Sequence, residues 1–326
     1  MSAASGPHRA TGLPVLRGLV RGQLARTFGG PAFDPTADRG DAGLTGPGSP
    51  SWRVIAEPAA IAGGVRGLLL QVAHPLAMAG VYDHSAFRDD PLGRLQRTSG
   101  YVTTSAFGST REALDAAARV RRAHPHVHGV APDGRPYRAD DPHLLGWVGI
   151  ALTSSFLAAH RAWAPVGLDR ADEDRFVLEQ SRIAALLDPR VDLDELRADT
   201  STSTAFRAGQ VPLPMLEEGY LPRDVEELGS ILAAYAPELG VNHQGREALR
   251  FLRWPPLPPA IRAAYLTLFG GAVGSLHPDH RAALGLQLPR GAARIAVGNT
   301  RAALSLMRRA TGTSPSMELA RARAAA

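Results

Sequence analysis

The sequence predicts a mostly or wholly α-helical fold, with one domain built of packed helices. Residues 55–81 form a nearly continuous apolar stretch that is too long for a strand and lacks strand alternation, which indicates a pair of buried helices. Asp90 and Pro91 provide an N-cap followed by a first-turn proline, and Pro142 starts a strongly apolar helix. No convincing β-alternation, glycine-rich dinucleotide motif or Walker motif occurs.

The chain is expected to divide into two parts. Residues 1–51 predict a mostly flexible N-terminal segment that carries one amphipathic helix over residues 15–28 and a flexible linker over residues 40–51. Residues 52–326 predict the helical domain. The amphipathic helix fits a partner, a membrane surface or the domain itself, and these alternatives stay open.

Within the apolar stretch, Gly63 and Gly64 permit a close approach of helices, and Pro75 restarts or kinks the second helix. A helix over residues 87–108 follows, and a further one begins at residues 109–112. Further helices are expected at about residues 142–163, 171–187, 192–207, 223–235, 244–252, 259–268, 290–310 and 316–325.

The end of the helix that begins near residue 109 is predicted at His124, because Pro125 disfavours an α conformation in the residue before it. Residues 124–129 should therefore be extended or turned. Residues 130–141, which are rich in Gly, Pro and Asp, are expected to form a loop.

The amino-acid composition excludes several kinds of functional site. The chain has no cysteine, which excludes disulfides, thiolate nucleophiles, iron–sulfur clusters and cysteine-ligated haem or zinc. It also has no lysine, so all 36 basic residues are arginines. The net charge is only +5 and arginines alternate with acids along most of the chain, so nucleic-acid binding is not expected.

The first residues contain no apolar secretory core, since Arg9, Arg17 and Arg21 interrupt every apolar run. No window reaches the roughly 18 uninterrupted apolar residues of a membrane-spanning helix, and the nearest is 144–159. A cytoplasmic location is the default expectation.

Residues 71–129 hold most of the polar groups that indicate a site. Five of the eleven histidines lie there, and the cluster Arg94, Arg97 and Thr98 follows helical spacing, so its members share one face of a helix. A solvent-facing stripe and satisfied core histidines would give the same pattern. The five histidines are His74, His84, His124, His126 and His128.

Three kinds of site fit these residues. One is haem, with His124 as the axial ligand and the Arg94, Arg97 and Thr98 side chains opposite it. Another is a non-haem metal site. An extended segment would point three alternate histidines the same way, and one aspartate would complete their ligand set. The last is a helical scaffold that encloses an apolar ligand. The hypothesis of a non-haem metal site concerns His124, His126 and His128 with Asp140 or Asp141.

Several motifs then occur in a specific order: QVAHP at residues 71–75, RLQRT at 94–98, VRRAHPHVHG at 120–129 and DPHLLGWVG at 141–149. Together they resemble the MpaB-type and rubber oxygenase (latex-clearing protein) family, with a clear likeness over residues 52–163. The resemblance implies an all-α, globin-like core that binds haem b without a covalent link. It also implies the use of dioxygen to cleave carbon–carbon double bonds in isoprenoid chains.

By this resemblance, His124 is the proximal ligand of the haem iron. Arg94, Arg97 and Thr98 match the distal pattern of rubber oxygenases, with arginine in place of lysine at the middle position. The implied reactants are dioxygen and a small or medium-sized apolar alkene, terpenoid or lipid-derived, with an unidentified redox partner. The alternative is a haem-free helical protein that binds a hydrophobic ligand or partner.

Two positions depart from the family pattern. Pro125 follows the implied ligand, and Gly149 stands where many relatives carry a histidine after Trp-Val. Two other histidines of the motifs are interpreted as structural: His74, because a proline follows it, and His84, because the adjacent Asp83 can tether its imidazole.

Overall fold

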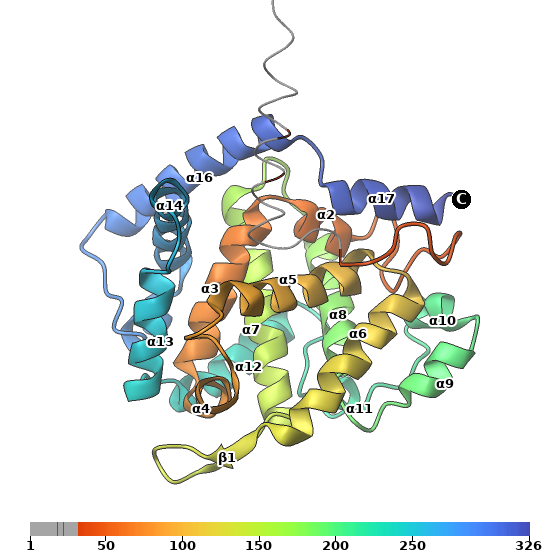
Figure 1. Ribbon diagram of the computed structural model, residues 1–326, viewed down its shortest axis with the longest axis horizontal. Coiled ribbons are helices and arrows are strands. Elements are labelled where there is room, and N and C mark those ends of the chain that lie inside the picture. Colours follow the sequence, from red (N-terminus) through yellow and green to blue (C-terminus); the bar gives the residue numbers. More distant parts are fainter. Residues whose placement is uncertain (1–17, 19–21, 23–31) are drawn as a thin grey trace, which may run out of the picture.

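A computed structural model describes residues 18, 22 and 32–326 of the chain. The described residues form sixteen α-helices, two short 3₁₀ helices and one two-stranded sheet, which confirms the predicted all-α fold (Figure 1). The amphipathic helix expected over residues 15–28 lies almost wholly outside the described residues.

The first half of the chain contains the central helices and the sheet. In order, its elements are α2 (Pro50–Ala56), α3 (Ala59–Ala73), α4 (Pro75–His84), α5 (Pro91–Phe107), α6 (Thr110–Ala123), η1 (His124–His126), β1 (His128–Val130), β2 (Pro136–Arg138) and α7 (Pro142–Trp163).

The second half is entirely helical within the described residues. In order, its elements are α8 (Arg170–Ala185), α9 (Leu193–Ala198), α10 (Thr202–Ala208), α11 (Pro214–Glu217), α12 (Val225–Tyr235), η2 (Ala236–Glu238), α13 (His243–Arg253), α14 (Pro259–Ser275), α15 (Pro278–Ala283), α16 (Ala292–Thr311) and α17 (Pro315–Ala324).

Helices α3 and α7 pack along each other at the centre of the molecule (Figure 1). A Cβ atom on Gly63 would lie 2.9 Å from the Phe156 ring and 3.2 Å from the Phe156 Cα, and one on Gly67 would lie 2.9 Å from Leu152. Gly64 faces open space. Close approach was therefore predicted correctly at Gly63 but wrongly at Gly64, because the second glycine of the contact lies one full turn after the first.

By length and composition α7 is the one helix among the described residues that could cross a membrane, apart from the bent pair α2 and α3. In the fold, 67% of its apolar window is buried by other helices. The core helix of a globular domain has this property.

The capping residues in the sequence predicted the starts of α5 and α6 correctly. The Asp90 carboxylate accepts a hydrogen bond from the Gly93 N–H at 2.8 Å, at the start of α5. At the start of α6, the Ser109 hydroxyl accepts from the Glu112 N–H and the Glu112 carboxylate accepts from the Ser109 N–H, which forms a capping box. These bonds are made within three residues, so the sequence alone specifies them.

The chain between α6 and α7 differs from the prediction. His124 has helical dihedral angles (φ −59°, ψ −41°) and begins η1, in which Pro125 is the second residue, although proline disfavours this conformation in the residue before it. The expected loop over residues 130–141 contains an antiparallel hairpin, in which His128 pairs with Arg138. Its strands have only three residues each, which is too short to show alternation in the sequence.

Two boundaries in the second half also differ. The single helix expected over residues 192–207 is interrupted, since α9 ends at Ala198 and α10 begins at Thr202. Helix α14 continues to Ser275, about two turns beyond the predicted end at residue 268.

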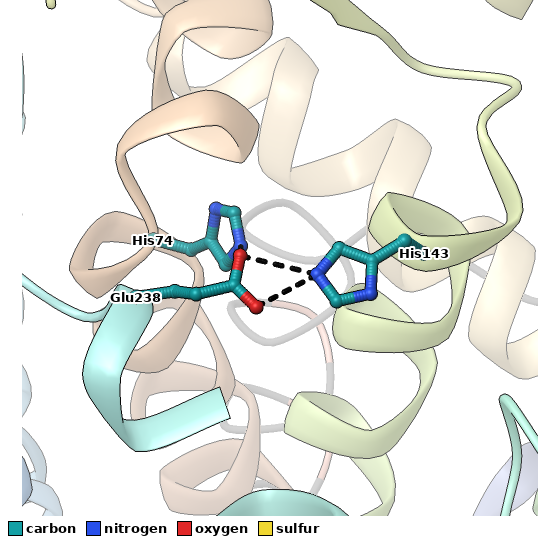
Figure 2. A group of neighbouring side chains, drawn as sticks. All are labelled: His74, His143 and Glu238. Carbon is teal, nitrogen blue, oxygen red and sulfur yellow. Dashed lines mark hydrogen bonds and ion pairs between the residues drawn. The ribbon is translucent and has the colours of Figure 1, made fainter. Parts of the chain in front are cut away.

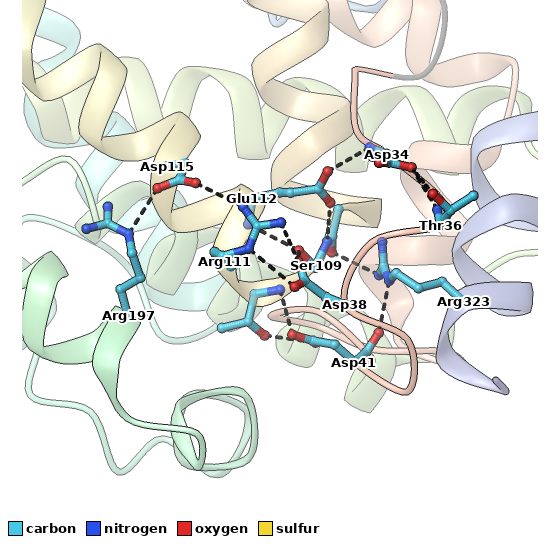
Figure 3. A network of polar contacts seen from close by, with 12 residues as sticks. Asp34, Thr36, Asp38, Asp41, Ser109, Arg111, Glu112, Asp115, Arg197 and Arg323 are labelled. Carbon is cyan, nitrogen blue, oxygen red and sulfur yellow. Dashed lines mark hydrogen bonds and ion pairs between the residues drawn. The ribbon is translucent and has the colours of Figure 1, made fainter.

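Residues 40–51 were expected to be a flexible linker, but they are packed into the protein. Leu44 is buried in the core, and the Asp41 carboxylate accepts hydrogen bonds from both the N–H and the hydroxyl of Thr110 (Figure 3). Gly43 has φ of +73°, a conformation that favours glycine. The glycines that suggested a linker instead allow the tight turns of an ordered segment.

Arg323 of α17 connects this segment to the end of α5. Its side chain is buried, and its guanidinium donates to the carbonyl oxygens of Asp41 (3.0 Å), Phe107 (2.8 Å) and Gly108 (3.0 Å). Burial lowers the pKa of Arg323. Five N–H donors in a planar fork allow one side chain to satisfy several carbonyl groups at once.

We predict opposite effects of alanine at adjacent glycines of α3. Gly63→Ala should lower the free energy of unfolding by about 1–3 kcal/mol, because the new methyl group overlaps Phe156. Gly64→Ala is the matched control, and it should raise stability by up to about 1 kcal/mol through helix propensity. Urea unfolding measures both. Equal effects of the two substitutions would show that α3 and α7 do not approach closely at Gly63.

We also predict that Arg323→Met costs about 3 kcal/mol of unfolding free energy or more, since it leaves buried carbonyl oxygens without donors. Arg321→Met changes an exposed arginine of the same helix and should stay within about 0.5 kcal/mol of the parent protein. The comparison uses guanidinium denaturation of both variants. A loss below 1 kcal/mol for Arg323→Met would contradict the role assigned to its guanidinium.

Candidate functional site

The three polar residues predicted on α5 share a helical face but have different surroundings. The half-buried Arg94 donates to the side-chain oxygen of Gln71 on α3 at 3.3 Å, and burial lowers its pKa to about 10. Within the described part of the chain, Arg94 has no acidic partner. Arg97 is 65% exposed and forms an ion pair with Asp90 at 3.3 Å. The exposed Thr98 donates its hydroxyl hydrogen to the Arg94 carbonyl oxygen at 3.1 Å.

His124 begins η1, directly after α6. Its Nδ1 atom is buried and has no hydrogen-bond partner among the described residues. Burial lowers the pKa of His124, and the negative charge of Asp140 opposes this shift only in part. The imidazole is therefore neutral near pH 7, which is the state that can donate a lone pair to a metal ion.

The structure does not bring His124, His126 and His128 together. His126 is exposed on η1 and His128 is exposed on β1. The hypothesis of a non-haem metal site required residues 124–128 to be extended throughout, and they are not. Asp140 binds Arg138 at 2.9 Å, and Asp141 caps α7. Neither aspartate completes a ligand set with these histidines.

The tether predicted between Asp83 and His84 is also wrong. The Asp83 carboxylate accepts from the Tyr137 hydroxyl at 2.6 Å, which attaches the hairpin to α4. His84 instead contacts the backbone oxygen of His128 through Nε2 at 3.1 Å. Both side chains hold the hairpin in place, so a structural role for His84 fits the geometry.

A second group of polar side chains was not predicted. The ligand atoms of His74, His143 and Glu238 all lie within 4.8 Å of one another (Figure 2). His143 Nε2 lies 2.9 Å and 3.1 Å from the two carboxylate oxygens of Glu238, and His74 Nε2 lies 3.4 Å from one of them. Among the described residues, no other set of three His, Asp or Glu side chains converges in this way.

His74 occupies the break between α3 and α4. Its Nδ1 accepts a hydrogen bond from the Ala77 N–H at 3.4 Å and so caps α4, which agrees with the structural role inferred from the sequence. The side chain is fully buried beside Trp147, with ring centroids 5.5 Å apart. Burial lowers the pKa of His74, although the nearby Glu238 charge acts in the opposite direction. This imidazole is therefore neutral.

Tyr235, the last residue of α12, supports the other two members. Its ring stacks on His143 with centroids 4.5 Å apart, and its hydroxyl donates to the His143 backbone oxygen at 2.7 Å. Glu238 follows within one turn, in η2. Burial raises the pKa of Tyr235, so its phenol stays neutral and can donate.

No motif or spacing in the sequence indicates a role for His143 or Glu238. Glu238 lies 95 positions after His143 in the chain, and neither residue sits in a metal-binding spacing. Only the packing of α7 against α3 and α12 places them beside His74.

Gly149 explains one departure from the family pattern. A Cβ atom at this position would lie 3.0 Å from the Ala184 Cβ on α8 and 3.2 Å from Leu221. A histidine side chain has no room there. Helix α8 packs closely on α7 at this position.

Two pockets of about 230 Å³ each lie elsewhere in the fold. One lies between the N-terminal segment, α8 and α10, and is lined by Leu44, Arg182 and Phe206 among others. The other lies between α14 and α16. Neither is lined by the residues predicted to bind haem or by the group around Glu238.

Comparison with known proteins decides the family. Residues 52–309 match the family described as "ER-bound oxygenase mpaB/B'/Rubber oxygenase, catalytic domain". The chain belongs to this family. This mpaB/rubber oxygenase assignment confirms the resemblance read from the motifs, and it supports an oxygenase function that uses dioxygen and an organic substrate. No curated protein and no solved structure matches the chain.

Proposed function

We propose that the protein is a haem-b-dependent oxygenase that uses dioxygen to oxidise or cleave a small or medium-sized apolar alkene, terpenoid or lipid-derived. Membership of the mpaB/rubber oxygenase family supports the reaction class. The observation that supports haem as the cofactor is the protonation state and burial of the His124 imidazole. Burial keeps its imidazole neutral, and Nδ1 is buried without a hydrogen-bond partner among the described residues.

His124 has the chemistry of an axial ligand. A neutral imidazole at the end of a helix can supply the single protein ligand that a b-type haem needs. Pro125 leaves the backbone of His124 helical, so the chain passes from α6 directly into η1. The negative charge of the Asp140 carboxylate acts on His124 and increases the basicity of the ring.

Arg94 is the residue of the α5 cluster best suited to polarise a reactant. Its guanidinium is half-buried, carries a charge at neutral pH and is bound only to the neutral amide oxygen of Gln71 among its described contacts. When bound, haem supplies the iron that activates dioxygen. Arg94 would donate hydrogen bonds toward the developing negative charge, where burial makes such donors more effective.

Arg97 and Thr98 have weaker support. Arg97 is held by Asp90, and the Thr98 hydroxyl is bound to the backbone of its own helix. Arg97 and Thr98 could contact a ligand only after the ion pair with Asp90 and the hydroxyl bond to the Arg94 carbonyl oxygen are broken. The proposal rests on the family and on the chemistry of His124 and Arg94, and not on a preformed cavity. A cytoplasmic location belongs to the same proposal.

The first test is haem retention by the parent protein and two histidine variants. We expect about one haem per chain after expression with haem precursor, and loss of most of it in His124→Ala, because the iron loses its ligand. His126→Ala removes an exposed imidazole two residues away and should keep the full complement. The Soret band and a pyridine haemochrome assay measure the stoichiometry.

Full haem content in His124→Ala would overturn the assignment of this ligand. A parent protein whose visible spectrum stays flat after haem addition would instead favour the alternative, a haem-free helical protein that binds a hydrophobic ligand.

The second test concerns Arg94. Arg94→Met should lower the rate of dioxygen consumption with a terpenoid alkene by about 10- to 100-fold, since it removes a donor to the reacting oxygen, while haem content stays unchanged. Arg122→Met alters an exposed arginine on α6 and serves as the control. An oxygen electrode records the rates. Equal rates for parent and Arg94→Met would remove Arg94 from the reaction.

A further inference from the structure

The group formed by His74, His143 and Glu238 is separate from the residues proposed to bind haem, and it has the composition of a metal site. From its geometry we propose that these three residues bind one divalent transition-metal ion. Two imidazole nitrogens and one carboxylate suit the ions of intermediate softness, Fe²⁺, Co²⁺ and Zn²⁺, better than Mg²⁺ or Ca²⁺, which prefer oxygen ligands.

The distances from the two histidines to the Glu238 oxygens match those around such an ion, and all three ligand atoms lie within 4.8 Å of one another. With bonds of about 2.0–2.1 Å, neighbouring ligands are about 3.0 Å apart in octahedral geometry and about 3.4 Å apart in tetrahedral geometry. His74 Nε2 lies 3.4 Å from Glu238, and His143 Nε2 lies 2.9 Å and 3.1 Å from its two oxygens. The three side chains point toward a common centre (Figure 2). An ion can therefore bind with small shifts of the side chains.

The buried nitrogen of His74 is an independent indication of a ligand. Its side chain is 0% exposed, and its Nε2 makes no hydrogen bond with acceptable geometry although it faces the Glu238 carboxylate. A buried polar nitrogen left without a partner is costly. An ion between His74 and Glu238 would satisfy it.

The site is rigid on one side and open on the other. His74 is fixed by its complete burial beside Trp147, and the ring of His143 is fixed by stacking on Tyr235. The side chains of His143 and Glu238 remain 44% and 30% exposed. An ion can thus enter from solvent, and water can fill its remaining coordination positions.

Two features set the strength of binding. Arg135 lies near enough for its positive charge to act on His74, but it is paired with Asp133 at 2.8 Å. Binding also requires the lone pair of His74 Nε2, so the ring proton must move to Nδ1 and the contact with the Ala77 N–H is lost. Because this contact is long, at 3.4 Å, the loss is small, and the Ala77 amide becomes a reporter of binding.

The test uses the full chain, freed of metal by chelation and titrated with Co²⁺ and Zn²⁺. We expect uptake of about one ion per chain, visible d–d bands of Co²⁺ and a shift of the Ala77 amide resonance. His143→Gln and Glu238→Gln should each weaken binding at least 10-fold. Both residues are partly exposed, so these variants avoid replacing the buried His74, and circular dichroism checks that they fold.

The matched control is His277→Gln. His277 also lies beside a carboxylate, with Nδ1 3.3 Å from Asp279, but no third ligand from the described part of the chain joins this exposed pair. It should bind the ion as the parent does. His124→Ala should also retain the ion, so the two proposals fail or succeed separately. Absence of Co²⁺ bands and of Zn²⁺ binding heat in the parent, or unchanged binding in both His143→Gln and Glu238→Gln, would overturn the site.

Discussion

Close packing of α3 against α7 determines where the polar groups of this protein lie. Gly63 and Gly67 remove the side chains that would hold the two helices apart, and Phe156 and Leu152 fill the space. The helices run in opposite directions, so the end of α3 meets the start of α7. His74 therefore lies beside His143, with ring centroids 6.3 Å apart. A wider separation would move His74 away from His143 and Glu238.

The end of α3 also connects the two candidate sites. Gln71 accepts a hydrogen bond from Arg94 of α5, and His74 follows one turn later and faces Glu238. The residues proposed for oxygen chemistry and those proposed for metal binding thus depend on the same turn of one helix. A displacement of α3 would change both groups together.

Two arginine side chains of this lysine-free chain, Arg66 and Arg323, are buried in the interior. Arg66 on α3 is 7% exposed, and its guanidinium donates to the Ser155 hydroxyl of α7 at 3.0 Å, while burial lowers its pKa to about 10. Arg323 binds backbone carbonyl groups instead of carboxylates. In both cases the hydrogen bonds of the buried guanidinium go to neutral oxygens, one for Arg66 and three for Arg323, and the three bonds of Arg323 suit a planar group with several donors.

The sequence by itself determined the helical class, the family and the helix starts. Hydrophobic periodicity, the Asp90 cap and the Ser109–Glu112 capping box act within a few residues, and the order of the motifs does not depend on packing. Only the tertiary structure decided that residues 40–51 are ordered, that Gly67 and not Gly64 faces α7, and that Glu238 joins two histidines. These outcomes depend on contacts between segments far apart in the chain. Local hydrogen bonds and periodic patterns involve only neighbouring residues, so they cannot predict such contacts.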